Sequence, residues 1–241
     1  MKFLIFDFDT AIGQVNSTMP YKFPKEGFEI EIQNTLDILD TLVKKQIKAV
    51  FAICGFAAEK SISPFDQREL IKEISTRGHE IASHSLKHEN FSRLNKNQVL
   101  ASLTRSKESL ELLLNSKIQK EIADFVPPHN RPMSWFRKGR IHPSDQPIFS
   151  RNGVKDIGDL IDCLNQVGYK WLRISGHILK KVFLSSLNNE HYHHKLYNVL
   201  GINILDGHHC GFNLTNNNDL VTISAHTLMW SRFEKVESKN A

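Results

Sequence analysis

Short apolar runs alternate with amphipathic segments along the chain. The runs are typical of buried strands, because they are rich in apolar and β-branched residues and several stop at Gly, Pro or Asp. We expect strands at residues 2–6, 47–53, 80–83, 122–126, 169–174, 202–205 and 220–225. Between these runs, leucine and isoleucine recur at helical spacing, which predicts helices at 33–45, 64–76, 96–114 and 157–167. The segments 131–152 and 178–198 lack either period and are expected to be long loops.

The alternation of strand and helix at this spacing indicates parallel βα units. With about seven strands in one chain, both a barrel and a doubly wound sheet remain open. In either architecture the carboxyl ends of the strands meet at one edge, and functional residues gather there. The polar residues that directly follow the apolar runs are therefore the candidates for chemistry.

The composition is that of a globular protein and excludes a disordered one, since 40% of the 241 residues are hydrophobic and 24% are charged. No run reaches the roughly 20 apolar residues of a membrane helix. The apolar run at the N-terminus is too short for a signal peptide, so we expect a cytoplasmic protein that starts at Met1 and spans no membrane.

The cysteines lie far apart, which predicts reduced thiols that pack as small hydrophobic side chains: Cys54, Cys163 and Cys210.

Charge and histidine content narrow the choice of partner. The net charge is +5, and the basic residues between 131 and 151 have few of the interleaved aromatic side chains of a nucleic-acid surface, with only Trp135 and Phe136 beside them. We therefore expect no nucleic acid as a partner, and a groove for an anionic small substrate accounts for the same charge. The 12 histidines are unusual, because histidine is both the commonest metal ligand and the acid–base group of neutral pH.

Two motifs stand at predicted strand ends. Asp7 and Asp9 follow the first apolar run, and residues i and i+2 of a strand point to the same side, so the two carboxylates should converge. HSLKH places His84 and His88 four residues apart, which brings both imidazoles to one face of a helical turn. One carboxylate with two imidazoles makes a set of three metal ligands that leaves positions for water and substrate. Solvated surface side chains would explain either motif without a site.

The order of these motifs is FDFD, IKAVFAICG, ELIKEISTRGHEIASHSLKH, DFVPPHN and VTISAH. It resembles that of the NodB-type polysaccharide deacetylases, carbohydrate esterase family 4, of which the chain looks like a divergent member. The resemblance extends over about residues 3–228 and implies a distorted (β/α)7 barrel, formed as a single catalytic domain over 1–241. It also implies a hydrolase that removes an acetyl group from an N-acetylated sugar with one divalent metal. That metal would be Zn²⁺ in the first place, with Co²⁺, Ni²⁺ or Mn²⁺ as alternatives.

The resemblance implies a role for each matching residue. Asp7 matches the catalytic base and His226 the general acid. Asp9, His84 and His88 match the metal ligands. The substrate groove would include the proline motif and later strand ends, with Pro128, His129, Asn130, Arg131, Arg173 and His208. The backbone N–H of His129 would help to hold the oxyanion.

The chain departs from the family pattern at two motifs that lie near the expected metal site. The proline motif of the family usually begins with an arginine that steadies the base, and Val126 stands in that place. Either Arg131 or Arg173 could take over this role. The family's later motif of an acidic residue with tryptophan is not clear, because Trp171 lacks the matching Asp. The role of a histidine cluster in a predicted loop also stays open: His191, His193 and His194.

Three functions remain open. The favoured one is a cytoplasmic deacetylase that acts on an acetamido sugar carried by a nucleotide or lipid, as in the synthesis of lipopolysaccharide and other surface polysaccharides, with an unknown oligomeric state. A catalytically degenerate sugar-binding module of the same fold is the second. The third is a phosphatase of the haloacid-dehalogenase type, since DFDT after FLIF resembles its nucleophile motif, with Asp7 as nucleophile. That family needs Ser or Thr where Cys54 stands, and it leaves His84 and His88 without a role.

Overall fold

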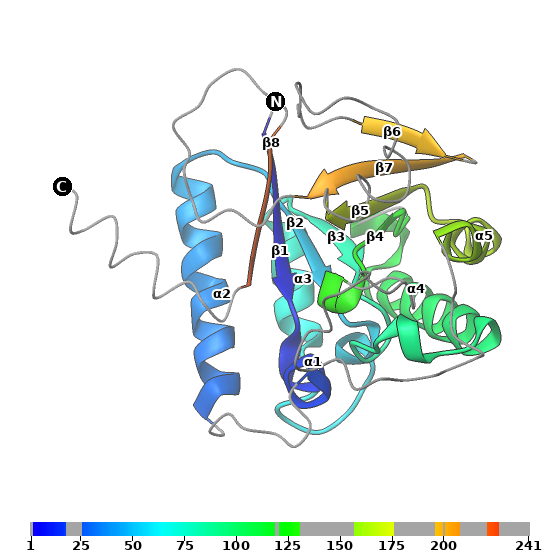
Figure 1. The fold of residues 1–241 in the computed structure, drawn as a ribbon. Helices are drawn as coiled ribbons and strands as arrows, with labels where there is room; N and C mark the ends of the chain where they lie inside the picture. Colours follow the sequence, from blue (N-terminus) through cyan, green and yellow to red (C-terminus); the bar gives the residue numbers. More distant parts are fainter. Residues whose placement is uncertain are drawn as a thin grey trace, which may run out of the picture.

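The computed structural model describes residues 2–17, 26–118, 121–130, 157–175, 196–199, 201–207 and 221–226. The strands in this part of the chain form one sheet in the order β6-β7-β5-β4-β3-β2-β1-β8 (Figure 1). Every ladder is parallel except that between β6 and β7, which confirms the predicted parallel α/β class. The strands are β1 (Lys2–Phe8), β2 (Val50–Ile53), β3 (Glu80–Ser83), β4 (Asp124–Phe125), β5 (Trp171–Ser175), β6 (Leu196–Val199), β7 (Ile202–Gly207) and β8 (Val221–His226).

The sheet is curved, but the described strands do not close it into a complete barrel. β6 and β8 are its two edges. β7 and β8 approach within 8 Å between Cα atoms, yet no ladder joins them among the described residues. β7 pairs with β5 on one side, and β6 covers residues 202–205 on its other side. The expected barrel is therefore an open one here.

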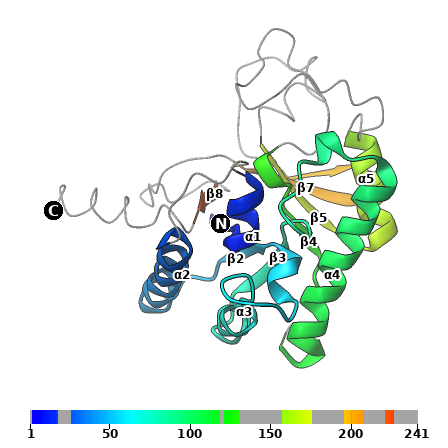
Figure 2. The same ribbon diagram turned by 90° about the horizontal axis from the view of Figure 1, so that it is seen from below.

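Four helices cover the outer face of the curved sheet: α2 (Glu26–Lys44), α3 (Arg68–Thr76), α4 (Lys96–Ile118) and α5 (Ile157–Val167) (Figure 2). Their apolar faces pack on alternate strand residues, and the main core accordingly includes Phe6 of β1, Ile71 of α3 and Leu103 of α4. The inner face of the sheet holds a smaller apolar cluster that includes Ala52 and Ala82. The larger of the two cores therefore lies under the helices, and the inner cluster is much smaller.

Several boundaries differ from those predicted. Helix α3 begins at Arg68 and not at residue 64, because the Asp66 carboxylate accepts the backbone N–H of Arg68 at 3.2 Å and also pairs with its guanidinium. Helix α2 begins earlier than expected, at Glu26. β6 lies at the end of a predicted loop. Helix α1 (Thr10–Ser17) was not predicted at all, because its few apolar residues form no stripe.

The cysteine prediction is confirmed where the structure describes it. Cys54 and Cys163 are free and buried, and Cys210 lies outside the described residues. Among the described helices, none has the length and the apolar character needed to cross a membrane. The predicted loop 131–152 lies outside the described residues.

Gly55 lies where α4 crosses the end of β2, in the short 3₁₀ helix η1 (Gly55–Ala58). A Cβ at this position would lie 2.5 Å from Ser106 Cα, and this backbone atom cannot move without shifting α4. We predict that Gly55→Ala lowers the free energy of unfolding by about 1–3 kcal/mol through overpacking, which thermal unfolding would measure as a lower Tm. Leu112→Ala, at an exposed position of α4, is the control. An unchanged Tm for Gly55→Ala would contradict this close approach.

Candidate metal centre

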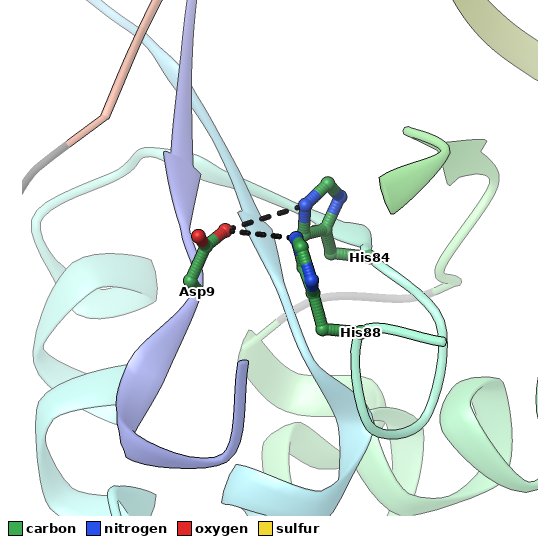
Figure 3. A group of neighbouring side chains, drawn as sticks. All are labelled: Asp9, His84 and His88. Atoms are coloured by element: carbon green, nitrogen blue, oxygen red, sulfur yellow. Dashed lines mark ion pairs between the residues drawn. The ribbon is translucent and has the colours of Figure 1, made fainter. Parts of the chain in front are cut away.

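Asp9, His84 and His88 come together beyond the carboxyl ends of β1 and β3 (Figure 3). The Nε2 atoms of both imidazoles lie 3.4 Å from Asp9 Oδ1. One ligand atom from each residue falls within 4.8 Å of the other two. Both imidazoles are buried, and the Asp9 side chain is 14% exposed. The three residues expected to be metal ligands are therefore close enough to bind one ion.

The ring of His84 has a defined tautomer. Its Nδ1 lies 2.7 Å from the carbonyl oxygen of Val126. A carbonyl only accepts, so Nδ1 carries the proton, and in the neutral ring Nε2 then presents its lone pair. This Nε2 is buried and lacks a hydrogen-bond partner among the described residues. A buried lone pair that faces a carboxylate oxygen is costly as it stands and fits a cation bound between the two.

The ring of His88 also directs its Nε2 toward Asp9 Oδ1. Its Nδ1 lies 2.9 Å from Ser17 Oγ of α1. Burial lowers the pKa of His88 to about 3, and the nearby Asp9 carboxylate opposes this only in part. The imidazole is therefore neutral at pH 7, which is the state that binds a metal.

His84 and His88 lie on a tight turn, which differs from the helical turn that their spacing predicts. Ser85 and His88 have positive φ values, 65° and 60°, and these interrupt any helix. The Glu89 carboxylate holds the turn from within, because it accepts the hydroxyl of Ser85 at 2.6 Å and the backbone N–H of Lys87 at 2.8 Å.

The same turn is anchored to two other elements. The backbone N–H of Gly55 in η1 donates to the carbonyl of Ser85 at 2.9 Å. The Ser106 hydroxyl of α4 donates to the same carbonyl at 2.9 Å, and Ser102 one turn earlier accepts the N–H of Leu86 at 3.1 Å. The two histidines are thus held on a rigid support, as a metal site requires.

A second ionic pair lies beside the cluster, on the inner face of the sheet. Arg173 Nη2 donates to Asp7 Oδ2 at 3.1 Å, and both side chains are almost fully buried. Three strands separate β1 from β5 in the sheet, so Arg173 reaches Asp7 across the inside of the curve. Between them, Ala52 and Ala82 are register partners with small side chains. Of the two arginines considered as replacements for the family's arginine, Arg173 contacts Asp7, and Arg131 lies outside the described residues.

The remaining predicted site residues are placed to different extents. His226 is the register partner of Asp7 in the ladder between β1 and β8. The ring of His129 packs edge-on against His88, with 4.3 Å between centroids. Pro128 and Asn130 flank His129 in the 3₁₀ helix η3 (Pro128–Asn130). The other candidates lie outside the described residues: Arg131, His191, His193, His194 and His208.

Sequence reasoning missed the contribution of α1. Gly13, Asn16 and Ser17 of this helix all contact the cluster or its turn. The sequence of α1 has no regular spacing of apolar residues, so neither the helix nor these contacts could be predicted from it. Glu89 was missed as well, although its position four residues after Ser85 suits a bond between their side chains.

Comparisons with known proteins support the resemblance that the motif order indicates. Residues 28–131 match the family model for polysaccharide deacetylase, a range that includes His84, His88 and His129. No curated protein matches the chain. Among solved structures, a putative polysaccharide deacetylase from Mycobacterium smegmatis superposes with a TM-score of 0.61 at 13% identity, over 100% of this chain and 83% of that one.

Other similar structures include a protein without activity. A CE4 family pseudoenzyme from Bacillus anthracis superposes with a TM-score of 0.50 at 12% identity, over 99% of this chain and 59% of that one. A mutant of this pseudoenzyme with restored enzymatic activity gives 0.51 at 12% identity, over 99% and 61%. The chain spans about three fifths of the length of both. At these identities the structures show a shared fold, and with the family model they confirm the expected resemblance to polysaccharide deacetylases.

We predict that the purified protein binds one divalent metal ion per chain, and that Asp9→Ala, His84→Ala and His88→Ala each lose it. Each substitution removes one of three ligands, and two ligands rarely retain an ion through dialysis. Elemental analysis after dialysis would measure the metal content, and thermal unfolding would check that each variant folds. Asp7→Asn is the matched control and should keep the metal. A His84→Ala variant with wild-type metal content would rule out this ligand set.

Proposed function

Because the chain resembles polysaccharide deacetylases in both sequence and fold, we propose that it is a metal-dependent hydrolase that removes an acetyl group from an N-acetylated sugar. One observation carries the proposal. Two carboxylates stand two residues apart at the end of β1, and each has a different set of partners: Asp9 faces two imidazoles, and Asp7 pairs with Arg173. One carboxylate is thus placed to bind a metal, and the other is left to act on a proton.

The proposed ligands are Asp9, His84 and His88. One carboxylate oxygen and two imidazole nitrogens suit Zn²⁺, and also Co²⁺, Ni²⁺ or Mn²⁺. When bound, such an ion would polarise the acetyl carbonyl and acidify a water molecule. The tautomer of His84 supports this role, because its Nε2 lone pair faces Asp9.

Asp7 is the proposed general base, which takes a proton from the attacking water. The Arg173 guanidinium balances its charge and fixes the orientation of one carboxylate oxygen, Oδ2. In the family pattern an arginine of the proline motif does this. Here Val126 stands in that place and contributes its backbone carbonyl to His84, and the arginine comes from β5.

His226 is the proposed general acid, which donates a proton to the leaving amine. Its register position beside Asp7 supports this role, since both residues then stand at the same level of neighbouring strands. The backbone N–H of His129 is the proposed donor to the oxyanion of the tetrahedral state. The contact of its ring with His88 supports a place next to the metal. Pro128, Asn130, Arg131 and His208 complete the proposed substrate groove.

The finer assignment is an acetamido sugar on a nucleotide or lipid carrier, as used in surface-polysaccharide synthesis in the cytoplasm. The net charge of +5 suits an anionic carrier. We also propose one domain over residues 1–241, because the proposed roles draw on positions from Asp7 to His226.

A catalytically degenerate sugar-binding module is the second candidate. It gains support from one comparison, since the similar structures include a CE4 family pseudoenzyme. The Asp7–Arg173 pair favours the enzyme, because it supplies the arginine that Val126 lacks. The phosphatase hypothesis gains no such support. Its missing hydroxyl corresponds to Cys54, a fully buried residue whose thiol pKa is raised by burial and by the nearby Asp9.

We predict that the protein releases acetate from at least one member of a panel of N-acetylated sugars and sugar nucleotides, and that Asp7→Asn lowers kcat by about 10²-fold or more while it keeps the metal. An amide cannot take the proton from water. An enzymatic assay for acetate measures the rate, and elemental analysis measures the metal. Full activity of Asp7→Asn would exclude Asp7 as the base. Bound metal without acetate release on the whole panel would favour the binding module.

For Arg173, we predict that Arg173→Met keeps the metal and loses most of the activity. Removal of one partner from a buried pair leaves an uncompensated charge, which costs about 3–5 kcal/mol, so the Tm should fall as well. Arg173→Lys restores the charge without the guanidinium geometry and should recover part of both. Wild-type kcat for Arg173→Met, measured at a temperature where the variant is folded, would contradict the role of this pair.

A further inference from the structure

Ser17, the last residue of α1, makes two hydrogen bonds that together define a direction. Its hydroxyl donates to the carbonyl of Gly13, one turn earlier in the helix, at 2.6 Å. A serine hydroxyl has one proton. At the second contact, 2.9 Å from His88 Nδ1, the oxygen of Ser17 therefore accepts, and the imidazole donates.

This direction determines the tautomer of His88. With the proton on Nδ1, the ring presents the lone pair of Nε2 toward Asp9 Oδ1, 3.4 Å away. The Val126 carbonyl imposes the same tautomer on His84. Two buried imidazoles are thus held in the form that binds a metal by two different acceptors, one of the backbone and one of a side chain.

The position of α1 makes the contact possible. Gly13 lets the helix come close, since a Cβ there would lie 2.8 Å from Asp9 Cβ and 3.4 Å from His88 Cβ. Asn16, the neighbour of Ser17, donates its side-chain amide to the backbone carbonyl of Lys87 at 2.5 Å. Helix α1 therefore makes two separate contacts with the turn, one to its backbone and one to the imidazole of His88.

We propose that Ser17 is a positioning residue that keeps His88 in the Nδ1-protonated tautomer and so sets the affinity of the cluster for a divalent metal ion. The proposal rests on the proposed function, because it takes Asp9, His84 and His88 as the ligands. Without the Ser17 hydroxyl, the ring can carry its proton on Nε2, where Asp9 accepts it. That proton would then have to move before a metal ion could bind.

The test compares Ser17→Ala with the wild type in two measurements that do not depend on activity. Nitrogen-15 NMR of the histidine rings in metal-free protein reports the tautomer, and competition with a chromophoric chelator measures the Kd for Zn²⁺. We expect Ser17→Ala to move the proton of His88 to Nε2, to leave His84 unchanged, and to weaken Zn²⁺ binding about 10- to 100-fold. Ser17→Thr retains the hydroxyl and should restore both values.

Asn16→Ala is the matched control, because it removes the other contact of α1 with the same turn. It should leave the His88 tautomer as in the wild type. If Ser17→Ala and Asn16→Ala weaken Zn²⁺ binding equally with the tautomer unchanged, α1 acts only as a support and the proposal is overturned. Wild-type affinity in Ser17→Ala would overturn it too. A wild-type protein without affinity for Zn²⁺ would instead refute the proposed function.

Discussion

The burial of two carboxylates at the end of a single strand is the constraint on which the rest of the site depends. Asp7 and Asp9 are only two residues apart, and charges withdrawn from water are costly unless each finds a partner. The protein meets this cost in two places. Arg173 compensates Asp7 from across the sheet, and Asp9 faces a pair of buried imidazoles, an arrangement that a cation completes. The curvature of the sheet makes the first pairing possible, because a flat sheet would keep β5 away from β1.

Close packing around the cluster gives it rigidity. Glycine occupies two points of close approach, Gly13 beside Asp9 and Gly55 beside α4. The turn that holds His84 and His88 then receives hydrogen bonds from several directions at once. Its backbone geometry is strained at two residues, and such strain persists only where the surrounding structure over-determines it. The candidate ligands thus owe their positions to contacts made by residues that bind no metal themselves.

Two residues from different strand ends hold the groups of this site in place, Val126 through its backbone and Arg173 through its side chain. Val126 cannot hold a carboxylate, yet its carbonyl orients His84, and a cation from another strand reaches the proposed base. The solved structures of this fold include both a pseudoenzyme and a mutant of it with restored activity.

From the amino-acid sequence alone, the parallel βα order, four of the helices, and the pairing of Asp9 with His84 and His88 could be predicted. The strand order and the helices depend on local periodicity, which the chain displays directly, and the ligand set was implied by the resemblance of the motif order to the polysaccharide deacetylases. The tertiary structure decided the rest: the open sheet with β6 on its edge, helix α1, the shape of the histidine turn, and the choice of Arg173. Asp7 and Arg173 are 166 residues apart, and Ser17 and His88 are 71 apart. Such contacts arise from the packing of distant segments, and neither propensity nor spacing along the chain encodes them.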